Sequence, residues 1–398
     1  MTTDFTATRN AFHLPNGTIY LDGNSLGPLP RAVPDRVATT IRDEWGEMLI
    51  TGWNRAGWMA KPGDLGDRIG RLIGAEAGHV TLGDTLSIKV YQALAAALAL
   101  RPDRHVVLSD NGNFPSDLYM AGGLLKTLGD KYELRVVAPE EVEDAITDEI
   151  AVLMLTEVDY RTGRKHDMKA LTRKAHDMGA LAVWDLAHSA GALPVDLSGC
   201  SADFAAGCTY KYLNSGPGGP AFIYVAPRHA DAALPALSGW LGHEAPFDFD
   251  LAYRPGRKVE RMRVGTPPVL QMAALEAAMD VWDMADIHDV RTRSIALSEL
   301  FIREVESSCP GLELVSPRDP QVRGSQVSFR FENGYAAMQA LIDRGVIGDF
   351  RAPDIMRFGI TPLYLGEDDI RQAAAILSQI LAGRHWDRPE YSVRQAVT

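Results

Sequence analysis

Lys211 is the residue in this sequence best suited to covalent chemistry. It directly follows Tyr210 and precedes the glycine-rich stretch 216–219. A lysine amine withdrawn from water becomes a nucleophile that forms a Schiff base with a carbonyl group. A second candidate is Asp185, which ends the apolar run 180–184. A carboxylate is costly to bury without a partner, so this position indicates pairing with a bound cation or a protonated ring.

A lysine and a carboxylate of this kind are together typical of a pyridoxal phosphate (PLP) site. PLP also needs a cradle for its phosphate and a group that stacks on its ring. A helix that starts after Thr85 predicts the cradle, because its free N–H groups attract a dianion and Ser87 adds a hydroxyl. The alternative is that Thr85 only caps this helix. Phe114 is a candidate for ring stacking, and Asp117 is either a helix cap or an acid in the pocket.

The composition excludes several classes of protein. The chain has 398 residues, of which 46% are hydrophobic and 23% charged, as in ordinary globular proteins. Its net charge of −12 argues against nucleic-acid binding. Its three cysteines form no C-x-x-C pair, which suits a reducing, cytoplasmic compartment. We find no signal peptide, no apolar run long enough to cross a membrane and no metal-binding motif.

Short apolar strands alternate with helices between about residues 64 and 255. We predict strands at His105–Ser109, Leu134–Val137, Ile150–Leu155, Leu181–Trp184, Phe204–Cys208 and Phe222–Val225, and helices at Leu86–Leu100, Ser116–Leu128 and Asp167–Met178. This alternation predicts an α/β fold with a mainly parallel central sheet covered on both faces. Ligands of such sheets bind beyond the carboxyl ends of the strands, where Thr156, Asp185 and Lys211 lie.

We expect three parts along the chain. Residues 1–60 form an N-terminal segment that contributes to the small domain and the active site, 61–255 form the large PLP-binding domain, and 256–398 form a smaller α+β domain. The first part contains a helix at Pro34–Leu49 with one apolar face. In the last part we predict helices at Val269–Met284, His288–Ser307, Tyr335–Arg344 and Glu367–Leu381, and a half-buried strand at Ser325–Phe331.

Two features of the sequence receive a structural interpretation. Residues 216–221 formally match the dinucleotide fingerprint G-x-G-x-x-A, but a strand rather than a helix follows them, so we predict a tight bend. Asp196 and Asp203 are expected to be surface or turn residues.

Motifs along nearly the whole chain resemble those of kynureninase, a fold-type-I PLP-dependent enzyme. The motifs are Leu21–Gly27, Phe114–Asp117, Asp185–His188, Tyr210–Asn214, Arg263–Pro268 and Arg357–Tyr364. Each is short, but their order makes the resemblance specific. It implies hydrolysis of L-kynurenine to anthranilate and L-alanine, with Cβ–Cγ cleavage through a ketimine and a gem-diol, in tryptophan degradation or NAD biosynthesis.

The resemblance also implies roles for individual residues. Lys211 would carry the cofactor, Asp185 would pair with its ring nitrogen, and Tyr210 is our candidate for general acid–base work. The residues expected to hold the cofactor are Leu86, Ser87, Phe114, Pro115, Ser116, Asp117, Thr156, Asp185, His188, Tyr210, Lys211, Trp240 and Thr266. Arg357 would clamp the substrate carboxylate through a bidentate contact. The other residues expected at the substrate are Asn24, Ser25, Trp53 and Thr266.

Two further expectations come from the same resemblance. Relatives that prefer 3-hydroxykynurenine tend to have histidine at about Trp53 and asparagine at Thr266, so this chain is expected to prefer L-kynurenine. Enzymes of this fold type are usually homodimers with sites at the interface. The loop Gly23–Gly27 and the regions of Trp53 and Thr266 are therefore candidates to act in the partner's site.

Two other functions remain open from the sequence. A cysteine desulfurase-like PLP lyase would need a catalytic cysteine on a C-terminal loop, and the one candidate, Cys309, lies at a predicted helix end. A PLP-fold protein without catalytic activity is the second alternative. The set of Lys211, Asp185 and Arg357 argues against it.

Overall fold

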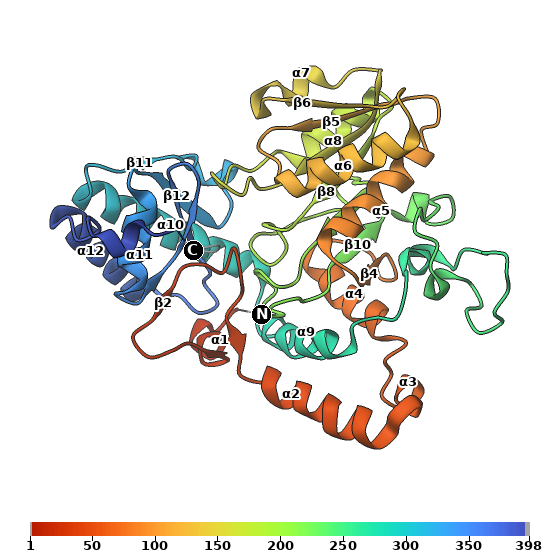
Figure 1. The fold of residues 1–398 in the computed structure, drawn as a ribbon, viewed down its shortest axis with the longest axis horizontal. Coiled ribbons are helices and arrows are strands. Elements are labelled where there is room, and N and C mark those ends of the chain that lie inside the picture. The colour runs from red at the N-terminus through yellow and green to blue at the C-terminus, as the bar shows by residue number, and fades with distance from the viewer. Residues whose placement is uncertain (1, 395–398) are drawn as a thin grey trace.

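A seven-stranded sheet forms the centre of the computed structural model, which describes residues 2–394 (Figure 1). In spatial order its strands are β4 (Val80–Leu82), β10 (Phe222–Val225), β9 (Phe204–Gly207), β8 (Leu181–Asp185), β7 (Ile150–Thr156), β5 (Val106–Asp110) and β6 (Glu133–Val137). The last five are parallel, whereas β10 is antiparallel to both of its neighbours. The predicted α/β fold is confirmed. Of the seven strands in this sheet, only β4 was not predicted.

Helices cover both faces of this sheet. They are α4 (Lys61–Leu72), α5 (Leu86–Ala99), α6 (Pro115–Leu128), α7 (Val142–Ala145) and α8 (Met168–Asp177). On β7, Met154 packs into a core with α5 and α6, whereas Leu153 and Leu155 pack into a core with α4 and α8. Such alternation is expected because successive side chains of a strand point to opposite faces. No helix in the described part of the chain is long and apolar enough to cross a membrane.

A second, antiparallel sheet lies toward the C-terminus. Its strand order is β11 (Glu313–Leu314), β12 (Gln326–Arg330), β15 (Ile355–Gly359) and β14 (Asp349–Arg351), and the helices α10 (Ile287–Ser308), α11 (Gly334–Ile342) and α12 (Glu367–Ala382) lie beside it. The expectation that β12 is half-buried was wrong, because all its residues except Arg330 are buried. Its second face meets the large domain, where the Gln326 amide donates to the Tyr160 carbonyl at 3.0 Å.

The N-terminal segment is joined to this second sheet region. After α1 (Phe5–Asn10), the strand β1 (Phe12–His13) pairs with β3 (Leu29–Pro30), and β2 (Ile19–Tyr20) pairs in parallel with β13 (Val346–Ile347). Figure 1 accordingly shows the red N-terminal segment beside the blue C-terminal region. The predicted division at residues 60 and 255 remains a proposal. Helix α9 (Val269–Trp282) packs against α2 (Val33–Thr39) and α4.

The helix predicted at Pro34–Leu49 forms in several pieces. An α-helix, α2 (Val33–Thr39), continues as a π-helical stretch, Thr40–Glu47, and is followed by a 3-10 turn, Leu49–Thr51, and by α3 (Gly52–Arg55). Its predicted apolar face is not buried in this chain, because Ile41 and Trp45 are exposed. The remaining 3-10 turns are Pro139–Glu141, Pro227–His229, Trp240–Gly242, Lys258–Met262, Pro320–Val322 and Pro389–Ser392.

Candidate active site

A cavity of about 160 Å³ lies beyond the carboxyl ends of β7, β8 and β9. The second sheet closes it, with side chains from β14 and β15. The lining residues are Asn24, Ser25, Leu86, Phe114, Thr156, Tyr160, Asp185, Ala187, His188, Tyr210, Lys211, Arg351 and Arg357. The structure therefore brings most of the predicted site residues into one cavity, at the position that parallel sheets use for ligands.

Lys211 and His188 are in direct contact at this cavity. The Lys211 Nζ atom lies 2.9 Å from the Nε2 atom of His188. Burial, and then the charge of Lys211, lower the pKa of His188 well below its usual value. The imidazole is therefore neutral, so its Nε2 atom can accept a hydrogen bond from the lysine amine. Its Nδ1 atom is buried and has no hydrogen-bond partner among residues 2–394.

Asp185 lines the cavity, and the buried carboxyl group of Asp117 lies beside it. Asp185 accepts a hydrogen bond from the backbone N–H of Ala187 at 2.7 Å, and Thr156 Oγ1 lies 3.4 Å from it. Burial raises the pKa of both carboxyls, and that of Asp117 most, because Lys211 and the Ala187 amide favour ionised Asp185. Like charges this close disfavour double ionisation, so one proton stays on the pair.

Asp117 does not cap helix α6, and its carboxyl group interacts with that of Asp185. Helix α6 has no side-chain cap, and the Oδ2 atom of Asp117 is buried without a partner in the described structure. Of the two interpretations that the sequence left open, the more common one was therefore wrong here. An unpartnered buried oxygen beside Asp185 indicates a bound polar group at this position.

The starts of two helices meet at the other end of the cavity. The Ser87 hydroxyl at the start of α5 lies 2.9 Å from the Ser116 hydroxyl, and Ser116 follows Pro115 at the start of α6. Thr85 has an extended backbone and makes no side-chain cap, so the alternative that it only caps α5 is not supported. The first N–H groups of both helices and two hydroxyls thus form a cradle for a dianion.

Arg357 is already held by protein groups. Its Nε atom donates to Asp349 Oδ1 at 2.6 Å, its Nη2 atom also donates to Asp349, and its Nη1 atom donates to the Tyr160 carbonyl. Nη2 further donates to Ser25 Oγ at 2.9 Å. Arg357 lines the cavity as predicted, but its bidentate partner is Asp349 rather than an open position for the substrate.

The acidic and basic neighbours of Arg357 were not found in the sequence. Asp22, Asp349, Arg351 and Tyr160 all lie around it. A signal was present for two of them, since Asp349 and Arg351 are two positions apart on a strand and therefore share a face. Asp349 also lies opposite Arg357 in the register of β14 and β15.

Asn24 offers an unpartnered amide to the cavity. The residue is fully buried, and neither Oδ1 nor Nδ2 has a partner in the described chain. Its Oδ1 atom lies against Gly359, and its predicted role at the substrate remains a proposal. The stretch Gly23–Gly27 also matches the pattern G-x-S-x-G of serine hydrolases. Ser25, however, donates to Asp349 at 2.5 Å, and no histidine bonds to its hydroxyl among residues 2–394.

The loop Gly23–Gly27 serves the cavity of its own chain. The Gly27 N–H donates to the Tyr210 carbonyl at 2.8 Å. A Cβ atom on Gly27 would lie 2.4 Å from the Lys211 carbonyl oxygen, so only glycine allows this approach. The expectation that this loop acts in the partner's site is not supported, because Asn24 and Ser25 already line the cavity within one chain.

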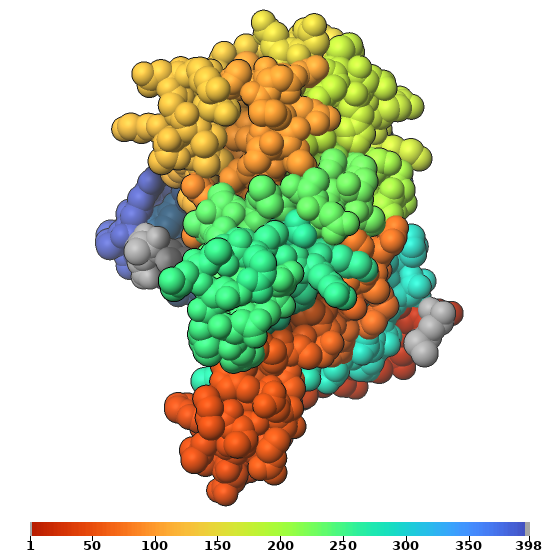
Figure 2. All heavy atoms as spheres, turned by 90° about the vertical axis from the view of Figure 1, so that its right-hand side faces the viewer, coloured from red at the N-terminus to blue at the C-terminus, as the bar shows by residue number. Residues whose placement is uncertain are grey.

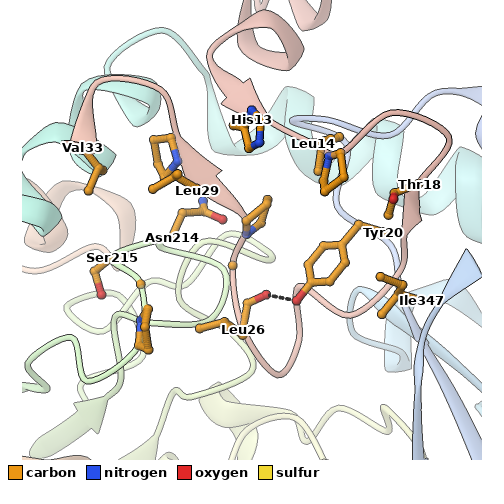
Figure 3. Close-up of a pocket in the computed structure, with 16 residues that line it drawn as sticks. His13, Leu14, Thr18, Tyr20, Leu26, Leu29, Val33, Asn214, Ser215 and Ile347 are labelled. Atoms are coloured by element: carbon orange, nitrogen blue, oxygen red, sulfur yellow. Dashed lines mark hydrogen bonds between the residues drawn. The ribbon is translucent and has the colours of Figure 1, made fainter. Parts of the chain in front are cut away.

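A larger cavity of about 350 Å³ is lined by residues of the N-terminal segment and by Asn214 and Ser215, which follow Lys211 in the chain (Figure 3). Asn214 and Ser215 flank it on one side and Tyr20 on another, and the Tyr20 hydroxyl donates to the Leu26 carbonyl at 2.7 Å. Its walls are largely apolar and include no lysine, arginine or carboxylate. The predicted bend at 216–219, where Gly216 and Gly218 have positive φ, adjoins this cavity and is confirmed.

Three predicted site residues do not reach Lys211 within one chain. Trp53 packs edge-on against Trp58, with ring centroids 5.8 Å apart. Trp240 is 43% exposed and packs edge-on against Phe247. Thr266 lines a separate cavity of about 270 Å³. Their predicted roles at the cofactor and substrate remain proposals.

The residues present fit PLP. Lys211 and Asp185 line one cavity with Leu86 and Phe114 from the starts of α5 and α6, and the unpartnered Asp117 Oδ2 and His188 Nδ1 indicate polar positions that a ligand would complete. Phe114 lines the same cavity, is 45% exposed and packs edge-on against Tyr160, so its ring remains accessible. The site thus supplies the nucleophile, anion, cradle and aromatic face that PLP requires.

Comparison with known proteins identifies the family. The chain is 51% identical to a kynureninase of Burkholderia pseudomallei (strain 1106a), over 98% of this chain and 95% of that protein. The chain belongs to the kynureninase family. A kynureninase of Pseudomonas fluorescens is 49% identical over the same shares of both chains, and residues 290–377 match the kynureninase C-terminal domain.

Solved structures with the same fold include other PLP-fold enzymes. A cysteine desulfurase from Thermococcus onnurineus NA1 matches with a TM-score of 0.80 at 19% identity, covering 96% of this chain and 99% of that one. A variant of C-DES with glycine covalently linked to its PLP cofactor matches with a TM-score of 0.78 at 18% identity, covering 93% and 98%. At such identities the likeness shows the fold alone.

The desulfurase alternative finds no support at the site. Cys309 is buried at the end of α10, and no cysteine lines the Lys211 cavity in the part of the chain that the structure describes. Cys208 lies near the cavity, but its Sγ atom is buried and directed at the Ala187 carbonyl. A catalytic loop cysteine is therefore lacking among these residues.

Proposed function

We propose that this member of the kynureninase family hydrolyses L-kynurenine to anthranilate and L-alanine with PLP as its cofactor. The observation that carries the proposal is the cavity in which Lys211, the Asp185–Asp117 pair and the Arg357 cluster meet. Identity of about 50% to kynureninases over nearly the whole chain supports the same reaction. Neither the desulfurase nor the non-catalytic alternative has comparable support.

The cofactor would be held by three groups of this chain. Lys211 would hold its aldehyde carbon through Nζ, Asp185 its ring nitrogen, and the starts of α5 and α6 its phosphate. When bound, PLP withdraws electrons from the substrate bonds that change. Asp185 supports this role because an ionised carboxylate keeps a proton on the ring nitrogen.

Proton transfers at the substrate would fall to Lys211 and Tyr210. Once the substrate amine has replaced it, the Lys211 amine is placed to take and return the proton at Cα, and neutral His188 can hold it by a hydrogen bond. Burial raises the pKa of Tyr210, so its hydroxyl stays protonated at neutral pH. Tyr210 is therefore the candidate that protonates the ketone oxygen as water adds to it, or the Cβ atom when the Cβ–Cγ bond of the gem-diol breaks.

Several finer features belong to the same proposal. Trp53 and Thr266 support a preference for L-kynurenine over 3-hydroxykynurenine. The reaction would serve tryptophan degradation, with a supply of precursors for NAD as the alternative. We propose a cytoplasmic location, since the free cysteines Cys200, Cys208 and Cys309 suit a reducing compartment.

A homodimer with sites at its interface completes the proposal. Large apolar side chains are exposed in two segments: Ile41, Trp45, Leu49 and Ile50 in the arm 33–55, and Phe247, Phe249 and Leu251 in the loop 243–253. Figure 2 shows both segments, orange and green, on the same side of the molecule. Exposed apolar surface of this extent is typical of an interface. Trp240 and Thr266, which do not reach Lys211 in their own chain, would then enter the partner's cavity.

The direct test is an assay with L-kynurenine. The purified protein with PLP should absorb visible light through Lys211 before substrate is added. We expect anthranilate fluorescence and one alanine per turnover, with slower turnover of 3-hydroxykynurenine. A PLP-bound protein that forms no anthranilate would contradict the proposed substrate, and a protein that does not bind PLP would contradict the proposed cofactor. Sulfide release from cysteine would instead support the desulfurase alternative.

A further inference from the structure

Arg351 stands beside Arg357 on the same wall of the active-site cavity. Its Nη2 atom lies 2.8 Å from Asp349 Oδ2 and donates to Ser25 Oγ at 3.3 Å. Asp349 and Ser25 are also the groups that hold Arg357. The two guanidinium groups therefore share one carboxylate and one hydroxyl, and both line the cavity.

The hydrogen bonds of Arg357 leave it little capacity for a ligand. A guanidinium has five N–H groups. Nε–H and both N–H groups of Nη2 are directed at Asp349 and Ser25, and one N–H of Nη1 is directed at Tyr160. A single N–H, on Nη1, is then left for a substrate carboxylate. A bidentate contact with Arg357 alone would require it to release a protein partner.

Arg351, unlike Arg357, has several N–H groups left to bind a ligand. Besides its contacts with Asp349 and Ser25, the described residues supply it with one further bond, from Nη1 to the Phe350 carbonyl at 2.9 Å. Its side chain is 32% exposed, whereas that of Arg357 is 2% exposed. Its Nε–H and the second N–H of Nη1 thus remain for a ligand.

The charges around the two arginines favour a further anion. Asp349 is ionised, because Arg357 lowers its pKa against the effect of burial. Burial, and then the charge of Asp349, raise the pKa of Asp22 to about 8, so Asp22 is mostly protonated near neutral pH. Two cations therefore face one carboxylate.

A purely structural role for Arg351 is hard to reconcile with this arrangement. Asp349 already has a bidentate partner in Arg357, so a second cation is not needed to neutralise it. Burial, and then repulsion from Arg357, lower the pKa of Arg351. Placing it here costs free energy that an anionic ligand between the two arginines would offset.

We propose that Arg351 is a second arginine for the α-carboxylate of the amino-acid substrate, which it binds together with the remaining N–H of Arg357. The inference rests on the proposed function, because it concerns an α-amino acid in the Lys211 cavity. It makes Arg351 a residue that determines specificity for substrates with a free carboxylate. Asp349 is the positioning residue that holds both guanidinium groups at the cavity wall.

The test compares substrates with and without this charge. In Arg351→Gln, KM for L-kynurenine should rise about 10- to 100-fold, the size expected for one charge-assisted hydrogen bond, while kcat changes much less. The KM for kynurenine amide, which lacks the negative charge, should rise only slightly in this variant. Arg351→Lys should recover part of the affinity. Arg371→Gln, which removes an exposed arginine of α12, is the matched control and should behave as wild type.

Binding of L-alanine supplies a readout that does not depend on turnover. Its affinity, followed through the visible absorbance of the PLP-loaded protein, should fall in Arg351→Gln by the same factor as that for L-kynurenine, whereas alaninamide binding should not change. Equal losses of affinity for L-alanine and alaninamide, or no loss of affinity for either compound, would overturn the proposed role of Arg351. A wild type that binds L-alanine but does not cleave L-kynurenine would contradict the proposed function, and the alanine comparison would still decide the role of Arg351.

Discussion

At the scale of single residues, burial decides which groups in the cavity carry charge. His188 is held neutral, and the Asp117–Asp185 pair retains a proton. Tyr210 keeps its hydroxyl proton. The nucleophile Lys211 thus has a neutral hydrogen-bond partner in His188 and lies near a carboxyl pair that is only partly ionised.

Replacement of Lys211 and Tyr210 separates covalent binding from proton transfer. Lys211→Ala should abolish both turnover and the visible absorbance of the linked cofactor. Tyr210→Phe should keep that absorbance but slow turnover by about 10²- to 10⁴-fold, the usual contribution of a general acid or base. Steady-state rates and absorbance spectra of both variants test this. Unchanged rates in Tyr210→Phe would leave its hydroxyl with a structural role only.

Asp22 should make the stability of the protein depend on pH. Its pKa of about 8 lies above the value of about 3.9 in the unfolded chain, so between these values the folded state binds more protons. The contribution of Asp22 to stability is therefore largest below about pH 4 and is lost as pH rises toward 8. An asparagine in place of Asp22 cannot ionise, and its amide can donate a hydrogen bond to Asp349.

We therefore expect Asp22→Asn to stabilise the protein more at pH 8 than at pH 5. The difference should be on the order of 1–3 kcal/mol in the free energy of unfolding. Urea unfolding at the two pH values measures it. Asp103→Asn, at an exposed position, is the control and should show no such difference. The same gain at both pH values would show that Asp22 is ionised throughout.

At the scale of secondary-structure elements, Asp203 joins several parts of the large domain. It lies in a bend just before β9 and is fully buried, so the expectation of a surface position was wrong for Asp203, whereas Asp196 is exposed as expected. Asp203 accepts hydrogen bonds from the Ala182 N–H of β8 at 2.7 Å and from His176 of α8 at 2.8 Å. Arg228 and His229 of the turn after β10 complete its shell, at 2.6 and 2.7 Å.

Asp203→Asn should therefore destabilise the fold without touching the active site. We expect a loss of about 2–4 kcal/mol, less than for a wholly buried pair because Arg228 and His176 are partly exposed. These contacts lower the pKa of Asp203, so its stabilisation is present above the unfolded pKa and is lost as the pH falls below it. The variant and wild type should thus converge in unfolding experiments in acid. Asp196→Asn is the control. An equal loss at all pH values would contradict the charge-based account.

At the scale of the whole molecule, the shared site of the proposed homodimer can be tested by complementation. Lys211→Ala and Trp240→Ala should each lose activity, the second because Trp240 would act in the partner's cavity. After subunit exchange, half of the dimers are mixed and each contains one intact site, so roughly a quarter of wild-type activity should return. Sedimentation should show dimers. If mixing restores nothing while heterodimers form, Trp240 acts in its own chain or only in folding.

Several features of this protein were determined by the sequence alone. Runs of apolar residues placed six strands of the large sheet within one or two residues of their observed bounds. A strand that is covered on both faces carries apolar side chains at successive positions, so it is visible in the sequence. Lys211 and Asp185 were recognisable because a charged residue after such an apolar run is costly to bury unless it has a partner. The ordered short motifs indicated the kynureninase family before any fold was known.

Only the tertiary structure decided which charges meet. Asp22 comes from a distant part of the chain, whereas Asp349 and Arg351 lie on the strand that pairs with the strand of Arg357, so their contact with Arg357 depends on the pairing of β14 with β15 and of β2 with β13. The burial of Asp203 and the pairing of Asp117 with Asp185 likewise follow from packing between elements. Charge states depend on burial and on neighbours within a few ångströms, and spacing along one chain specifies neither of these.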